Sequence, residues 1–252
     1  MLILNDLLPL WGTCEYEGSC FIAAAFPYLL PAEYYQGRNV SRYAVVRDYH
    51  DICGARLEQA CVRLRELFPG KHFEWHLDYP PLPEVQLAAM AGLGHQGRHN
   101  MFITPAYGSW VFLGEIKSEV PLPGCDRTIP KRSCAGCAVP CVAACPTGAL
   151  RADGTFDRAL CLSAISQRKG ELTPEEADLL QQAGIAWGCD LCQEACLRNK
   201  NIRTEPLAEF LADPIAHVTT QTPLAGRAYA WRGQAVIHRN LGILDDKHKE
   251  ST

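Results

Sequence analysis

The sequence has no excess of basic residues. Its 24 lysines and arginines stand against 28 aspartates and glutamates, which gives a net charge of −4 and a pI near 6.1. Proteins that coat nucleic acid through charge alone carry a large basic surplus. The charge balance therefore excludes that class and restricts any RNA contact to a local patch.

Long apolar segments and an export signal are also missing. The longest apolar stretch, residues 21–32, contains Pro27 and Pro31 and falls short of the roughly 20 residues that span a bilayer. The first nine residues contain no basic side chain and are interrupted by Asn5 and Asp6, so they do not resemble a signal peptide. We expect a cytoplasmic protein with no membrane partner.

Cysteine, by contrast, is abundant, with 13 residues in the chain. Cytosolic thiols stay reduced, so a dense set of cysteines in such a protein usually binds metal. Nine of them crowd residues 125–196, behind a Pro/Gly linker at residues 121–124. The sequence thus predicts three parts: residues 1–120, residues 121–205 and a short helical tail at residues 206–252. The other four cysteines are expected to be small buried apolar side chains: Cys14, Cys20, Cys53 and Cys61.

Residues 1–120 show the mixture of patterns that is typical of an α+β domain with a mixed sheet. Apolar residues recur at helical spacing over residues 48–68 and 83–91, and Pro or Gly follows each stretch. Strands are predicted over residues 21–26, 73–77, 101–103 and 110–113, the last two joined as a hairpin. Gly92, Gly94 and Gly97 follow a helix rather than a strand, so we reject a dinucleotide- or phosphate-binding loop.

The cysteine spacing in residues 121–205 indicates a ferredoxin-like domain with two 4Fe-4S clusters. The run of Cys134, Cys137, Cys141 and Cys145, followed by Pro146, is one residue longer than the bacterial ferredoxin run. In two-cluster ferredoxins the fourth cysteine of such a run binds the other cluster. The first cluster is then expected to take Cys134, Cys137, Cys141 and Cys196.

The second cluster takes Cys145, Cys189 and Cys192 and needs one more thiolate. Either Cys161 or Cys125 can supply it, and Cys161 is favoured because it lies between the two groups of cysteines. Structural zinc is the alternative, because paired cysteines two residues apart also occur in zinc sites. The Cys-Pro-Thr-Gly sequence that begins at Cys145 is typical of ferredoxins and favours iron–sulfur.

Beyond the cysteines, the chain resembles the epoxyqueuosine reductase family, which acts in queuosine biosynthesis in tRNA. The resemblance covers about residues 21–241 and includes Asp78, Gly94 sixteen residues later, the Lys169-Gly170 pair and the Arg239-Asn-Leu241 sequence. The matching segments are residues 41–50, 108–116, 145–149, 161–163 and 188–193. It is identified as a short form, without the helical repeats that end the longer members.

The resemblance implies a cobalamin-binding front domain, related to that of reductive dehalogenases, ahead of the two-cluster domain. It also assigns the missing cluster ligand to Cys161 and the role of proton donor to Asp78. An aspartate has an unperturbed pKa near 3.9, so acting as an acid near pH 7 requires burial or nearby negative charge. We expect apolar walls around Asp78 to provide that burial.

The same resemblance places two backbone segments, residues 92–102 and 108–113, along the corrin ring. The expected cofactor contacts are Ser41, Asp78, Gly94, Arg98, Phe102, Leu113, Ser163 and Asp190. Several positions depart from the family pattern, among them His95 in place of a tryptophan, Arg98 in place of a lysine and Leu197 in place of a proline.

The implied function is the reduction of epoxyqueuosine to queuosine in tRNA by an oxidoreductase that receives electrons from an external donor. A basic cluster near the end of the chain offers a further contact for tRNA, consisting of Arg227, Arg232, His238 and Arg239 beside Trp231. Two alternatives stay open: an iron–sulfur electron-transfer protein, and a cobalamin-dependent reductase of another, smaller substrate.

Overall fold

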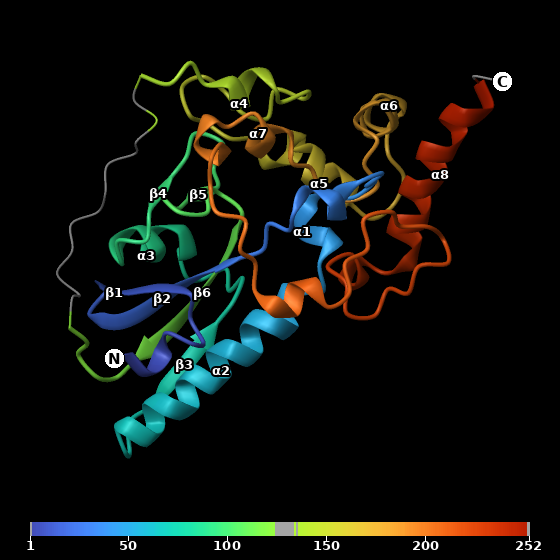
Figure 1. The fold of residues 1–252 in the computed structure, drawn as a ribbon. Helices are drawn as coiled ribbons and strands as arrows, with labels where there is room; N and C mark the ends of the chain where they lie inside the picture. The colour runs from blue at the N-terminus through green and yellow to red at the C-terminus, as the bar shows by residue number, and fades with distance from the viewer. Residues whose placement is uncertain (1, 124–133, 135, 251–252) are drawn as a thin grey trace. The chain divides into compact units, whose positions relative to one another are not determined.

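The computed structural model describes residues 2–123, 134 and 136–250 (Figure 1). Cys125 and the end of the predicted linker lie outside these residues. The chain packs as two compact units. The first consists of Met1–Leu29, Tyr49–Cys137 and Arg198–Glu209, and the second of Leu30–Asp48, Ala138–Leu197 and Phe210–Thr252. Because packing rather than sequence order defines these units, the predicted boundaries at residues 120 and 205 stay a prediction.

A four-stranded sheet forms the centre of the first unit, in the order β1-β2-β6-β3. All three strand pairs are antiparallel, so the predicted mixed sheet is wrong. The reason is that β3 pairs with β6 rather than with β2, so the helical crossover between β2 and β3 creates no parallel neighbours. The strands are β1 (Leu10–Tyr16), β2 (Ser19–Pro27), β6 (Val111–Ser118) and β3 (Phe73–His76).

One face of the sheet is covered by α2 (Tyr49–Leu67), which confirms the helix predicted over residues 48–68. Its buried positions recur every three or four residues, as expected for one apolar face. The approach to β6 is close, because a Cβ on Gly114 would lie 2.8 Å from Leu57 Cδ1. The buried residues of α2 are Cys53, Gly54, Leu57, Ala60, Cys61 and Leu64.

The opposite face is covered by α3 (Glu84–Met90), as Figure 1 shows. Leu87 and Ala88 of this helix pack with Cys14 of β1 and Ala23 of β2, and Leu113 of β6 packs against the same cluster. Cys14, Cys53 and Cys61 are buried as expected, whereas Cys20 is only half-buried.

The predicted hairpin between residues 101–103 and 110–113 is wrong. Strand β5 (Phe102–Ile103) pairs with β4 (His95–Gln96) in a separate two-stranded ladder, while β6 belongs to the main sheet. Strand β1 was not predicted from the sequence. It joins β2 through Glu17 and Gly18, whose φ values of 48° and 73° are those of a tight hairpin turn.

The second unit is mainly helical. Thr173 and Glu176 form a capping box at the start of α6, and Gly184 ends that helix with a φ of 63°. Within the described residues, no helix is both long and apolar enough to cross a membrane. The α-helices are α1 (Arg42–Val45), α4 (Pro140–Ala143), α5 (Leu162–Ser166), α6 (Pro174–Ala183), α7 (Leu191–Glu194) and α8 (Gln234–Glu250).

Short 3-10 turns complete the chain, and they lie at Leu2–Leu4, Ala32–Tyr35, Arg158–Leu160, Leu197–Asn199, Ala208–Leu211 and Ala230–Arg232.

The contact between β1 and the end of α3 leads to a stability prediction. A Cβ on Gly12 would lie 2.2 Å from the carbonyl oxygen of Ala91, so Gly12→Ala has to displace backbone. We expect this change to cost roughly 1–3 kcal/mol of stability. The matched variant Gly242→Ala lies in α8 with no atom near its new Cβ, and we expect it to gain up to about 1 kcal/mol. Chemical denaturation of both variants tests the contrast, and equal midpoints would contradict it.

Candidate functional site

Asp78 lies two residues beyond β3, in a loop of the first unit. Its φ of 48° is in the left-handed region, which is uncommon for a residue other than glycine and often marks a functional position. The side chain is 53% exposed, so the expected apolar walls around it are wrong. The loop turns sharply ahead of Pro80 and Pro81, and this turn carries the carboxyl outward instead of into the core.

The first turn of α2 holds the Asp78 carboxyl. The Tyr49 hydroxyl donates a hydrogen bond to Asp78 Oδ2, and His50 Nε2 lies 3.6 Å from the same oxygen. The Tyr49 ring stacks on Phe112 of β6 with a centroid distance of 4.1 Å, which fixes the direction of its hydroxyl. Asp78 is therefore oriented through an aromatic stack that begins in the sheet.

Two glutamates that influence Asp78 were not predicted from the sequence: half-buried Glu84 and buried Glu115. Burial, followed by the charge of Asp78, raises the pKa of Glu84 to about 7. Burial, followed by the charges of Glu84 and Asp78, raises the pKa of Glu115 to about 9. The signal for Glu115 was present, because it stands two residues after Leu113 on the same face of a strand.

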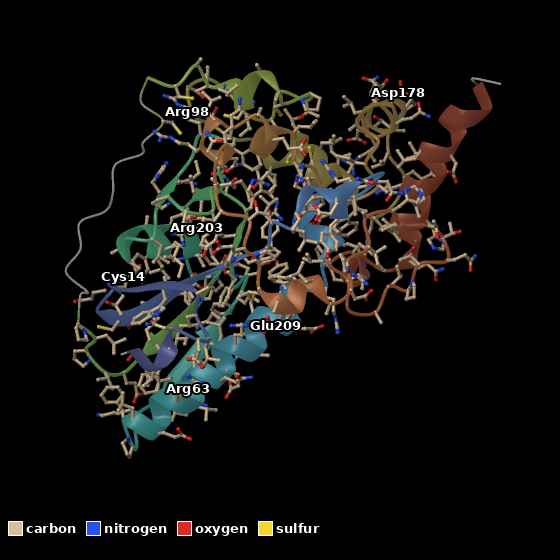
Figure 2. The ribbon with its side chains drawn as sticks, in the orientation of Figure 1. Cys14, Arg63, Arg98, Asp178, Arg203 and Glu209 are labelled. Atoms are coloured by element: carbon tan, nitrogen blue, oxygen red, sulfur yellow. The ribbon has the colours of Figure 1, made fainter. Side chains whose placement is uncertain are left out.

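The predicted corrin-lining segment, residues 92–102, also lies in the first unit. Gly94 fits tightly, since a Cβ there would lie 2.0 Å from the Ile103 carbonyl oxygen. Phe102 is buried and Leu113 is half-buried. Arg98, which is labelled in Figure 2, follows β4 and is half-buried. This segment also contains His99, which the sequence analysis missed.

His99 is 4% exposed, and burial lowers its pKa to about 4, so its ring is neutral. Its Nδ1 accepts a hydrogen bond from the Met101 N–H, and its Nε2 has no hydrogen-bond partner among the described residues. A neutral imidazole carries one proton on its two ring nitrogens. Because Nδ1 accepts a hydrogen bond, the proton is on Nε2, which is therefore a buried donor.

Three other predicted cofactor contacts lie in the second unit. Ser41 is buried with no partner for its hydroxyl among the described residues, and Gly188 packs against it with a φ of 75°. Asp190 accepts the Arg42 N–H at 2.7 Å and pairs with Arg38 at 3.2 Å. Ser163 accepts a hydrogen bond from the side chain of Gln167. Asp190 is thus a structural anchor, whatever else it contacts.

Six of the eight predicted cluster ligands lie in the second unit, at the ends of short helices. Cys141 lies in α4 and Cys192 in α7, and these two helices pack together. Cys145 follows α4, Cys161 precedes α5, and Cys189 and Cys196 flank α7. The remaining two, Cys134 and Cys137, belong to the first unit, and Cys137 is exposed.

Four of these thiols act on one another electrostatically: Cys145, Cys161, Cys189 and Cys192. Burial raises the pKa of Cys189 to about 12, and nearby Asp190, Cys161 and Cys145 add to the shift. Cys145 differs, because hydrogen bonds from the Thr147 hydroxyl and from backbone N–H groups outweigh its burial and lower its pKa. These donors point at the position of a thiolate.

Within the described residues, no three His, Cys, Asp or Glu side chains converge closely enough to hold one metal ion.

The predicted basic cluster near the end of the chain is only partly available for RNA. Arg227 is buried and donates to the carboxylate and carbonyl oxygens of Asp213. Arg239 donates to the carbonyl oxygens of Arg168 and Gly170. Trp231 remains 60% exposed, with the Arg232 guanidinium 3.6 Å above its ring.

Two family models match separate parts of the chain. Residues 18–78 match "Epoxyqueuosine reductase QueG, DUF1730". Residues 133–199 match "4Fe-4S double cluster binding domain".

The chain is also similar to an epoxyqueuosine reductase from Listeria monocytogenes, with 30% identity over 94% of this chain and 66% of the relative. Two solved epoxyqueuosine reductases each cover 90% of this chain, and this chain covers 63% of theirs. The first was solved with an epoxyqueuosine-modified stem loop of tRNA-Tyr and has a TM-score of 0.74 at 26% identity.

The second solved structure, from Bacillus subtilis, has its catalytic aspartate loop swung out of the active site and a TM-score of 0.73 at 25% identity. The chain thus spans slightly less than two thirds of the length of these relatives. Since the family model over residues 18–78, the sequence relative and the solved structures all point to the same family, the chain belongs to the epoxyqueuosine reductase family.

Proposed function

We propose that this chain reduces epoxyqueuosine to queuosine in tRNA, using cobalamin, two 4Fe-4S clusters and an external electron donor. The observation that carries the proposal is the Asp78 loop. A carboxyl in a left-handed turn, oriented by Tyr49 and His50, is available to a substrate outside the sheet. A relative's structure with its catalytic aspartate loop swung out supports the view that such a loop moves.

The thiols of the second unit fit an iron–sulfur cluster. Cys145, Cys161, Cys189 and Cys192 lie within electrostatic reach of one another, and four thiolates are what one cluster takes. Bringing four negative sulfurs together is unfavourable unless cationic iron compensates their charge. We propose these four residues as the ligands of the second cluster.

For the first cluster we propose Cys134, Cys137, Cys141 and Cys196, on the sequence spacing and on the family model that covers residues 133–199. Two clusters deliver electrons one at a time, which suits a reaction that needs two.

The cobalamin proposal has its own support in the first unit. The Nε2 of His99 is a buried polar atom without a partner among the described residues, within the segment expected along the corrin. A buried orphan donor of this kind fits a bound polar group that is not part of the chain. Bound cobalamin would supply a strongly reducing centre for attack on carbon.

We propose Gly94, Arg98, Phe102 and Leu113 as contacts of this cofactor. Ser41, Ser163 and Asp190 stay predictions from the family motifs.

The chain's own chemical contribution is proton donation. Removing an epoxide oxygen as water consumes two electrons and two protons and leaves a carbon–carbon double bond. Asp78 protonates the departing oxygen, and Tyr49 and His50 keep its carboxyl in position. The substrate assignment is supported by the relative solved with a modified tRNA stem loop. Exposed Trp231 offers an aromatic surface for a base.

The first test is Asp78→Asn. We expect turnover of an epoxyqueuosine-containing tRNA stem loop to fall at least about 100-fold, because an amide cannot donate a carboxylic proton. Cobalamin and iron contents should stay unchanged, which separates lost chemistry from lost folding. A variant that turns over at the wild-type rate would rule out Asp78 as the donor.

The second test concerns the proposed ligand Cys161. In Cys161→Ser, the iron content of the reconstituted protein should fall from about eight to about four atoms per chain, since one cluster loses a ligand. Cys20→Ser is the matched control, a half-buried cysteine of the first unit, and should keep full iron content. Iron analysis with EPR of the reduced protein provides the measurement. Full iron in Cys161→Ser would remove this residue from the ligand set.

A further inference from the structure

Three carboxyl groups of the first unit influence one another: Asp78 in its loop, Glu84 at the start of α3 and Glu115 in β6. They differ sharply in exposure. The side chain of Asp78 is 53% exposed, Glu84 is half-buried, and Glu115 is only 1% exposed. These three carboxyl groups, Asp78, Glu84 and Glu115, are called the acidic row below. The acidic row runs from the surface loop to the face of the sheet that α3 covers.

Glu84 is tied directly to the Asp78 loop. Its carboxyl accepts hydrogen bonds from the backbone N–H groups of Asp78 and Tyr79. Its Oε1 is buried and has no partner among the described residues. One side of this carboxyl thus holds the loop, while the other side has an oxygen that is free to carry a proton.

Glu115 is the innermost member of the acidic row and lies on the central strand β6. It stands between Ala23 of β2 and His76 of β3 in the strand register, and its Oε2 is buried without a partner in the described part of the chain. A buried carboxylate with an unsatisfied oxygen is costly, so the neutral acid is the stable form. Glu115 is therefore a neutral neighbour when Glu84 ionises.

The proposed reaction needs such a reserve of protons. Opening the epoxide and releasing its oxygen as water consumes two protons, together with two electrons from an external donor. As the proposed donor, Asp78 supplies one proton. If the bound substrate covers the exposed side of Asp78, the second proton has to reach it from the protein side.

We propose that Glu84 is the proton relay of this enzyme: it returns a proton to Asp78 between the two protonations of one turnover. The proton leaves the Glu84 carboxyl as Asp78 regains its own, and solvent reprotonates Glu84 after product release. The inference rests on the proposed function, because it takes Asp78 as the donor to the substrate.

The pKa values of the two glutamates suit these roles. The pKa of Glu84, raised to about 7, makes it half-protonated near neutral pH, and the pKa of Glu115, raised to about 9, leaves that group protonated. Burial is the largest cause of the raised pKa of Glu84, and negative charge on Asp78 adds to it, so the proton affinity of Glu84 rises when the donor has given up its proton.

Other titratable groups face this row from neighbouring elements. His50 and Tyr49 approach from α2, and His50 lowers the pKa of Glu84 when it is charged. His76 of β3 stands opposite Glu115 and stacks on Tyr79. On the same face, β1 adds Cys14 and Tyr16, and β4 adds His95.

The activity test compares Glu84→Gln with Glu66→Gln, a control at an exposed glutamate of α2. Glutamine keeps an acceptor for the loop N–H groups and loses the transferable proton. In the wild type, turnover of the modified stem loop should decline as pH rises through about 7, because Glu84 loses its proton. Glu84→Gln should lose this inflection and turn over at least about tenfold more slowly at pH 6.5. Glu66→Gln should match the wild type.

A second measurement needs no substrate. In the full chain with oxidised clusters, carboxyl 13C NMR of labelled glutamate should show Glu84 titrating near pH 7. In Asp78→Asn the same signal should titrate at lower pH, because the charge that raises its pKa is gone. An unshifted Glu84 signal would overturn the coupling.

The outcomes separate the relay from the proposed function. If Asp78→Asn is inactive while Glu84→Gln keeps the wild-type rate and inflection, the function stands and the relay is overturned. If only Glu84→Ala is slow, Glu84 merely positions the loop, which also overturns the relay. If Asp78→Asn is fully active, both the donor and the relay fail.

Discussion

The antiparallel pairing of β6 with both β2 and β3 is the constraint on which the first unit depends. Successive side chains of β6 point to opposite faces, so a single strand serves two purposes. Phe112 supports the stack that orients Tyr49, and Glu115 lies on the face toward α3. A slip of one residue would exchange these roles and remove both the orientation of Asp78 and the buried acid behind it.

In the acidic row, an exposed carboxyl, that of Asp78, has less exposed carboxyls beside it that can supply protons. Burial stabilises neutral Glu115, charge from Asp78 stabilises protonated Glu84, and backbone N–H groups tie Glu84 to the loop. The two glutamates therefore keep distinct pKa values, about 7 and about 9. Asp78 lies in a surface loop, whereas Glu84 lies on helix α3 and Glu115 on strand β6.

Much of this arrangement could be predicted from the sequence, and the exceptions have physical causes. Apolar periodicity predicted helices α2 and α3, and the family resemblance singled out Asp78. The predicted hairpin failed because pairing partners are chosen by tertiary packing, which gave β5 to β4 and β6 to the main sheet. Strand β1 was not predicted because Gly12 weakens its strand pattern. Glu84 was not predicted because its raised pKa arises only from burial and from neighbours that folding brings together.

The two units are each assembled from three separate stretches of chain. In the second unit, the backbone at Asn39 and Ser41 bonds to Ala186 and Trp187, next to the second group of cysteines. A fragment beginning at the Pro/Gly linker would lack these partners, although it would contain every predicted cluster cysteine. A contiguous piece of chain is therefore not a folding unit here: the segment that carries the cluster cysteines depends for part of its packing on residues that precede the sheet's helix α2 in the chain.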